Sequence, residues 1–133
     1  MLNREAMPRI VAAYGPMWSG KSSKLKTAYE MSGGIHVKLF RPVGDNRPPR
    51  AHEIGFKDRF KQVADLEALV QVVNEDRSTA SERHLILIDE AHLFGDSGWT
   101  DLFSKLDNHR LFIAGLERGL DNKQFSWLSH VRR

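Results

Sequence analysis

The sequence predicts an α/β fold with a mainly parallel sheet flanked by helices, and three observations support this. Short apolar runs alternate along the chain with stretches of helical periodicity. A glycine-rich loop joins the first apolar run to the first helical stretch. The chain has 133 residues, of which 41% are hydrophobic and 28% charged, as is typical of one packed domain. We therefore expect residues 1–133 to form a single domain, without a second one.

The first predicted strand is "RIVAAY", residues 9–14, a short and partly β-branched run that ends at Gly15. From residue 21 to residue 31 the pattern turns helical, and the "SGG" that follows supplies a glycine stop. Strand, loop and helix therefore follow one another directly.

The next segment combines two predicted strands with a long loop. Residues 35–40, "IHVKLF", alternate between apolar and polar and predict a second strand. Residues 41–55 hold three prolines and two glycines and form the longest irregular stretch, which favours a functional loop. "KDRFKQVA", residues 57–64, predicts a short strand.

The second half of the chain continues the alternation. Asp65 can cap a helix over residues 66–76, whose leucines and valines recur at helical spacing. The further expected elements are a strand over 84–90, a helix within 96–109 from about Gly98, a buried strand over 110–117 and a short helix over 120–133. Strands that alternate with helices indicate a parallel sheet.

Residues 15–22, "GPMWSGKS", match the pattern G-x-x-x-x-G-K-[ST] at every fixed position. Glycines let the backbone wrap so that N–H groups point at a phosphate, and the helix N-terminus adds a positive dipole. In this pattern Lys21 neutralises the β- and γ-phosphates and the Ser22 hydroxyl binds Mg²⁺. We therefore predict a single P-loop (RecA-like) domain that binds ATP and Mg²⁺; the alternative is a glycine-rich turn that happens to contain a lysine.

The expected nucleotide-binding residues are Gly15, Pro16, Met17, Trp18, Ser19, Gly20, Lys21, Ser22 and Ser23.

Two acids follow the apolar run "LILI". A buried strand that ends in Asp89 places a carboxylate at the carboxyl edge of the sheet, where α/β folds bind ligands. Asp89 is expected to hold the magnesium. Glu90 is expected to point to the other side, within reach of a water or hydroxyl nucleophile. The alternative is a pair of solvated acids at a helix start.

Composition limits the partners. A formal net charge of +3 suits an anionic ligand but lacks the dense basic footprint of a dedicated DNA-binding protein, which disfavours nucleic acid as partner. With no cysteine, and six histidines without a close pair at ligand spacing, no zinc is expected. The sequence shows neither a signal-peptide core nor an apolar run of membrane-span length, so we expect a cytoplasmic protein without a membrane partner.

The segments "GPMWSGKSSKL", "VKLFRPVGDNR", "LILIDEAHLF" and "RLFIAGLERGLDNKQF" carry letters beyond the loop pattern. Together they resemble the type II thymidine kinase family over about residues 9 to 131. Pro16 and Met17 narrow the loop to this family's version, and Asp45 and Arg47 match its D-x-R. The segment "LILIDEAHLF" differs from the family's pattern at His92, where the family has glutamine.

The resemblance implies an ATP- and magnesium-dependent kinase that phosphorylates the 5′-hydroxyl of a deoxynucleoside, thymidine in this family. It implies that Glu90 is the general base, that Lys21 and Arg47 stabilise the transferred phosphoryl group, and that Met17, Asp45, His92, Leu116 and Phe125 lie at the substrate pocket. Family members continue into a small four-cysteine zinc domain whose loop covers the base. We expect that domain to be absent, because these residues contain no cysteine.

Two other functions stay open. The chain could be a catalytically reduced, kinase-derived protein that regulates a protein partner through exposed Trp18, Trp99 or Trp127, although these tryptophans are better explained as packing residues. It could also be an ATPase in which Glu90 activates water. The family tends to form tetramers, so a homo-oligomer is a further expectation.

Overall fold

A computed structural model describes residues 9–15, 21–33, 36–43, 59–76, 82–95, 97–116 and 127. Within these residues the elements are β1 (Ile10–Gly15), α1 (Lys21–Met31), β2 (Val37–Pro42), β3 (Lys61–Val63), α3 (Leu66–Glu75), β4 (Leu85–Ile88), the short 3₁₀ helix η3 (Ala91–Phe94), α5 (Trp99–Lys105) and β5 (Arg110–Leu116). This confirms the predicted alternation. The helix expected over 120–133 lies outside the described residues except for Trp127.

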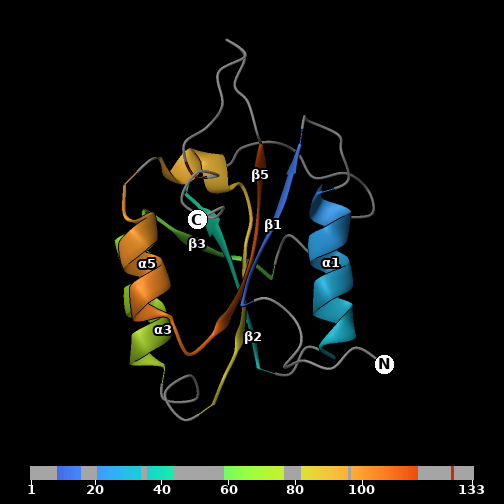
Figure 1. The fold of residues 1–133 in the computed structure, drawn as a ribbon, viewed down its shortest axis with the longest axis horizontal. Helices are drawn as coiled ribbons and strands as arrows, with labels where there is room; N and C mark the ends of the chain where they lie inside the picture. The colour runs from blue at the N-terminus through green and yellow to red at the C-terminus, as the bar shows by residue number, and fades with distance from the viewer. Residues whose placement is uncertain are drawn as a thin grey trace.

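The five described strands form one sheet in the order β1-β5-β4-β2-β3, and every neighbouring pair is parallel. All of them therefore end at the same edge, which is the upper edge in Figure 1, where α1 begins and η3 lies. The α/β class with a parallel sheet is confirmed.

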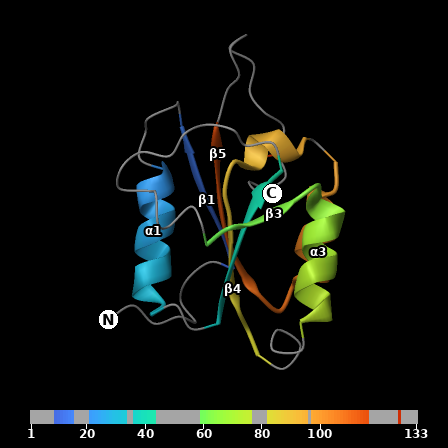
Figure 2. The ribbon, with the colours of Figure 1, turned by 180° about the vertical axis from the view of Figure 1, so that it is seen from behind.

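Helices cover both faces of the sheet. α1 packs on one face, whereas α3 and α5 lie together on the other (Figure 1, Figure 2). The side chains of β4 alternate between the two cores that result: Ile86 and Ile88 join the α3 and α5 core, and Leu87 joins the α1 core. All three are fully buried, and burying one such side chain stabilises a fold by roughly 1.5–3 kcal/mol. Because β4 is buried on both faces, every residue of its sequence "LILI" is aliphatic.

The helix ends follow their local sequence signals. The Asp65 carboxylate accepts a hydrogen bond from the Ala68 N–H at 2.8 Å, which caps α3 as predicted. α5 begins after Gly98, whose φ of 96° is in the left-handed region that glycine adopts without strain. Gly33 follows α1 with a φ of 71°, so the predicted glycine stop is also confirmed.

The sequence did not predict η3. This single turn follows the two acids after β4 and ends at Gly95, which has a φ of 81°. Its residue Ala91 is fully buried, so the turn is packed against the sheet. η3 therefore forms part of the edge at which the strands end.

Candidate functional site

The site lies at the edge of the sheet where the strands end, and β1 and β5 end there side by side. Gly15, the last residue of β1, pairs with Leu116, the last residue of β5. The described chain resumes at α1, which begins on this same edge (Figure 1). Chain connections that leave β1 and β4 for opposite faces are the arrangement at which open α/β sheets bind ligands.

Asp89 follows β4 directly and is only 2% exposed. Its backbone N–H donates to the Phe40 carbonyl oxygen of β2 at 3.0 Å, which continues the strand pairing by one residue. Its carboxylate oxygen Oδ1 accepts the N–H of Glu90 at 2.9 Å. The first acid is thus fixed by backbone contacts on both sides.

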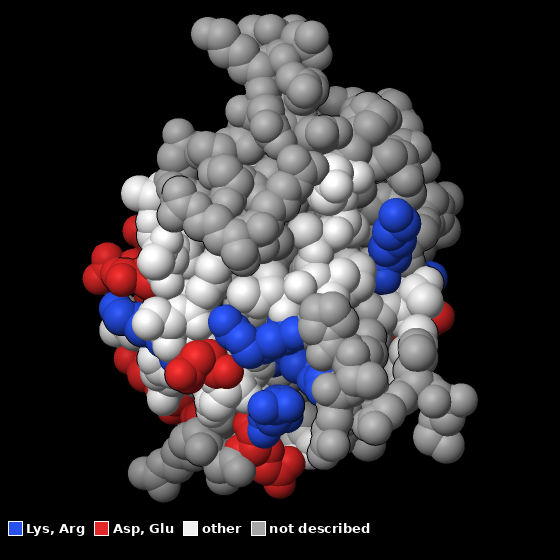
Figure 3. Space-filling model, viewed as in Figure 1, with Lys and Arg blue, Asp and Glu red and all other residues white. Residues whose placement is uncertain are grey.

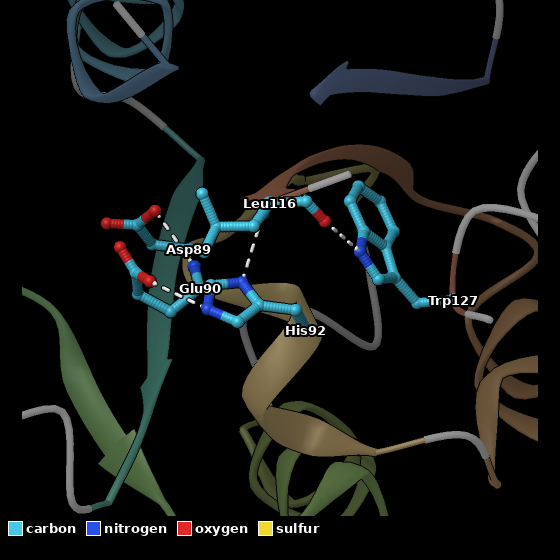
Figure 4. A network of polar contacts seen from close by, with 5 residues as sticks. All are labelled: Asp89, Glu90, His92, Leu116 and Trp127. Carbon is cyan, nitrogen blue, oxygen red and sulfur yellow. Dashed lines mark hydrogen bonds and ion pairs between the residues drawn. The ribbon is translucent and has the colours of Figure 1, made fainter. Parts of the chain in front are cut away.

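Glu90 is 3% exposed and has a left-handed backbone, with φ 54° and ψ 44°. A non-glycine residue in this region is strained by about 1–3 kcal/mol, and such strain gathers at functional sites. The same turn corrects one expectation: Glu90 does not point to the side opposite Asp89. Figure 4 shows both carboxyl groups projecting to the same side, because the left-handed residue interrupts the alternation of the strand.

His92 lies in η3, two residues after Glu90. Its Nε2 is 3.4 Å from Oε2 of Glu90, and both side chains are almost fully buried, with 6% and 4% exposed. Its Nδ1 accepts the backbone N–H of Leu116 at 3.0 Å (Figure 4). The sequence placed His92 near the site but gave no sign of either contact, because both depend on a turn that it did not predict.

Leu116 connects this turn to the buried aromatic residues. Its carbonyl oxygen accepts the indole N–H of Trp127 at 2.9 Å. A Cβ added to the preceding Gly115 would lie 3.0 Å from the Trp127 ring and 3.1 Å from both the Cβ and the backbone nitrogen of Ala91. Glycine at 115 therefore lets η3, β5 and Trp127 pack closely together.

The structure brings together Asp89, Glu90, His92 and the backbone of Leu116, with Gly15 at the same sheet edge. The backbone of residues 21–23 forms the first turn of α1. The other predicted site residues lie outside the described part of the chain: Pro16, Met17, Trp18, Ser19, Gly20, Asp45, Arg47 and Phe125.

Two of the three tryptophans are packing residues. Trp99 is fully buried and Trp127 is 1% exposed, and their ring centroids are 6.2 Å apart. Trp99 also donates its indole N–H to the Gly95 carbonyl oxygen at 3.0 Å. The suggestion that these two could form an exposed contact surface is therefore wrong, because neither reaches the solvent. Trp18 lies outside the described residues.

Three histidines that are far apart in the sequence meet at the opposite edge of the sheet. The rings of His36 and His84 are 5.1 Å apart, and those of His84 and His109 are 5.9 Å apart. Nδ1 of His109 accepts the backbone N–H of His84 at 3.0 Å. Burial lowers the pKa of His109 below its ordinary value of 6.5, and the charges of His84 and Arg83 lower it further, while Asp107 raises it.

The distribution of surface charge and of possible metal ligands does not point to a particular partner. Figure 3 shows most of the Lys and Arg side chains of this face in its lower half, with Asp and Glu beside them, so no surface of one sign appears on its described part. Within the described residues, no group of three or more His, Asp or Glu side chains is arranged to hold a metal ion. No described helix has the length and apolarity that a membrane crossing requires.

Comparison with known proteins identifies the family. No curated protein matches the chain. A family model described as thymidine kinase matches residues 9–131, nearly the whole chain, and this confirms the resemblance carried by the four sequence segments. The chain therefore belongs to the thymidine kinase family.

Proposed function

We propose that this chain transfers the γ-phosphoryl group of ATP to the 5′-hydroxyl of a deoxynucleoside, with thymidine as the acceptor and Mg²⁺ as the metal. Family membership supports a nucleotide-binding kinase. The observation that carries the proposal is the buried pair Asp89 and Glu90, at the edge where β1 ends and α1 begins. A phosphate bound between β1 and α1 would lie at the same edge as a carboxylate base.

Glu90 takes the role of general base. The 5′-oxygen attacks the γ-phosphorus, the bond from this phosphorus to the β,γ-bridging oxygen breaks, and ADP leaves. The proton of the 5′-hydroxyl passes to the Glu90 carboxylate, a transfer that typically contributes about 10²–10⁴-fold to the rate. The burial of Glu90 supports this role, since water is kept from its carboxylate and the reacting groups interact more strongly.

Asp89 and Ser22 fit magnesium as oxygen ligands. Mg²⁺ is usually held by one or two carboxylates, waters and the substrate phosphates, so the lack of a larger ligand group among the described residues does not conflict with it. When bound, the ion neutralises negative charge on the phosphates. The chain's own contribution is to hold Asp89 in place: the Glu90 N–H donates to its carboxylate, and its backbone N–H donates to the Phe40 carbonyl oxygen.

The phosphates are bound by the segment from Gly15 to Ser23. Its ends support this assignment, since Gly15 closes a parallel strand and Lys21 opens the helix, which is the setting that a phosphate loop requires. Helix N-terminal N–H groups attract anions. Lys21 neutralises the β- and γ-phosphates, and Arg47 stabilises the transferred group.

The proposed nucleoside pocket is lined by Met17, Asp45, His92, Leu116 and Phe125, with His92 at the position where the family has glutamine. The pairing of Leu116 with Gly15 supports this, because it puts the end of β5 beside the end of β1. We propose that residues 1–133 act as one nucleotide-binding domain in the cytoplasm, without zinc.

Radiolabel transfer tests the proposal. The protein is incubated with γ-labelled ATP, Mg²⁺ and each of the four deoxynucleosides, and the products are separated by chromatography. We expect labelled thymidine monophosphate. The proposal fails if no labelled nucleotide forms at high protein concentration. Phosphate release without any acceptor, lost in Glu90→Gln, would instead assign an ATPase.

A further inference from the structure

His92 is placed to hold the Glu90 side chain, and its ring is anchored on both sides. On one side, Nδ1 accepts the Leu116 N–H at 3.0 Å, a normal hydrogen-bond length. On the other, Nε2 lies 3.4 Å from the Glu90 carboxylate. Figure 4 shows the ring between the end of β5 and the carboxyl group.

The Leu116 contact selects the tautomer of His92. A ring nitrogen that accepts a hydrogen bond cannot carry a proton, so the neutral ring has its proton on the other nitrogen, Nε2. The nearest carboxylate oxygen, Oε2 of Glu90, lies 3.4 Å from Nε2, so the two groups attract one another electrostatically without forming a hydrogen bond. The attraction between them acts in a buried setting, where the low dielectric strengthens it.

Glu90 needs such a contact because its backbone does not follow the strand. The left-handed φ of 54° turns its side chain away from the alternation that fixes side chains along β4. A glutamate side chain also has several rotatable bonds, so a base on such a turn is poorly oriented by its backbone alone.

The backbone that His92 contacts is itself held by further contacts. The Leu116 carbonyl oxygen accepts the Trp127 indole N–H, and Gly115 leaves room for Trp127 to pack closely against Ala91. The Leu93 N–H donates to the Glu90 carbonyl oxygen at 3.0 Å, which closes the turn between the two side chains.

From this geometry we propose that His92 is a positioning residue: through Nε2–H it holds the Glu90 carboxylate in the orientation that accepts the proton of the acceptor hydroxyl. The inference rests on the proposed function, in which Glu90 is the base. In this role the ring carries its proton on Nε2, because Nδ1 accepts the Leu116 N–H.

Two substitutions test the role. His92→Leu removes both polar contacts, and we expect kcat for thymidine phosphorylation to fall by about 10–100-fold, the scale of loss from a misplaced group. KM for ATP should change by less than about threefold, because phosphate binding does not use this residue. His92→Gln should recover most of kcat, because an amide can accept from Leu116 and donate to Glu90. His109→Leu, at the opposite edge of the sheet, is the control for the loss of a buried histidine. Thermal unfolding is measured for every variant to show that it is folded.

A folded His92→Leu variant with the kcat of the wild type would overturn the inference. So would a His92→Gln variant no better than His92→Leu, because packing alone would then explain the loss. A wild-type protein that transfers no phosphate would overturn the proposed function itself, and this is seen before any variant is compared.

A spectroscopic measurement tests the contact without using activity, and it still applies if His92→Leu does not fold. Long-range ¹H–¹⁵N correlation spectra of histidine-labelled protein identify the protonated ring nitrogen, and the signal missing in His92→Gln assigns His92. We expect the Nε2–H tautomer. A proton on Nδ1 would overturn the inference, because the ring could then not accept from Leu116.

Discussion

The same kind of hydrogen bond occurs at both edges of the sheet, the carboxyl edge where the strands end and the amino edge where they begin. At the carboxyl edge, Nδ1 of His92 accepts a backbone N–H from Leu116; at the amino edge, Nδ1 of His109 accepts one from His84, and both bonds are 3.0 Å long. The neighbours differ. His92 faces the carboxylate of Glu90, whereas at His109 burial and the charges of His84 and Arg83 lower the pKa more than Asp107 raises it.

This difference shows what the shared bond can do. In both places it fixes a neutral ring with its proton on Nε2. Beside a carboxylate, that proton orients an acid side chain. At His109, burial first and the charges of His84 and Arg83 second lower the pKa despite Asp107, so the bond leaves a histidine that is harder to charge. We therefore propose a positioning role for His92 at the carboxyl edge, whereas at the amino edge the same bond links His109 to the backbone of His84.

Gly115→Ala would disturb the packing at the carboxyl edge and leave the amino edge unchanged. The added Cβ lies 3.0–3.1 Å from Trp127 and from the Cβ and backbone nitrogen of Ala91, so η3 or the indole must shift. We expect the free energy of unfolding to fall by about 1–3 kcal/mol, as is typical of overpacking. We also expect kcat to fall, because η3 carries His92. Urea unfolding and thymidine phosphorylation measure the two effects.

Asp65→Ala is the matched control for this loss of stability. It removes the cap of α3 and should cost about 1 kcal/mol, yet it touches neither Glu90 nor His92. If both variants lower kcat equally in the folded protein, η3 has no special role and the comparison of the two edges fails.

At the amino edge, His109 should make the free energy of unfolding depend on pH. The folded-state pKa of His109 is lowered, so the unfolded chain binds its proton more readily. The stability that this residue contributes is therefore fully present above the unfolded value of 6.5, and it is lost as the pH falls from there toward the folded pKa. One such group changes the free energy of unfolding by at most about 1.4 kcal/mol per pH unit.

His109→Gln should flatten this part of the curve. The measurement is urea unfolding of wild type and variant between pH 7.5 and pH 5, with the difference between the two curves assigned to His109. Parallel curves, with a constant offset, would contradict the assigned pKa direction.

Much of the fold could be predicted from the sequence because its signals are local. The helix over residues 21–31, the Asp65 cap and the buried run that ends at Asp89 each depend on neighbouring residues, and the structure confirms them. The parallel sheet followed from the alternation of these elements.

The contacts within the site could not be predicted, because they depend on strand order and on one left-handed residue. Nothing in "DEAH" shows that Glu90 has a positive φ, and nothing places Leu116 beside His92 until β5 is known to lie next to β4. The three histidines of the amino edge meet for the same reason. Each precedes one of β2, β4 and β5, which are neighbours in the sheet but distant in sequence.

The central claim is that the carboxyl edge carries a catalytic base, and Glu90→Gln tests it most directly. Single-turnover phosphorylation of thymidine and the Kd for ATP are measured for the wild type, for Glu90→Gln and for the exposed control Glu75→Gln. We predict that Glu90→Gln slows transfer by about 10²–10⁴-fold while the Kd for ATP changes only a few-fold, and that the control changes neither. A folded Glu90→Gln variant that transfers phosphate at the wild-type rate would contradict the account.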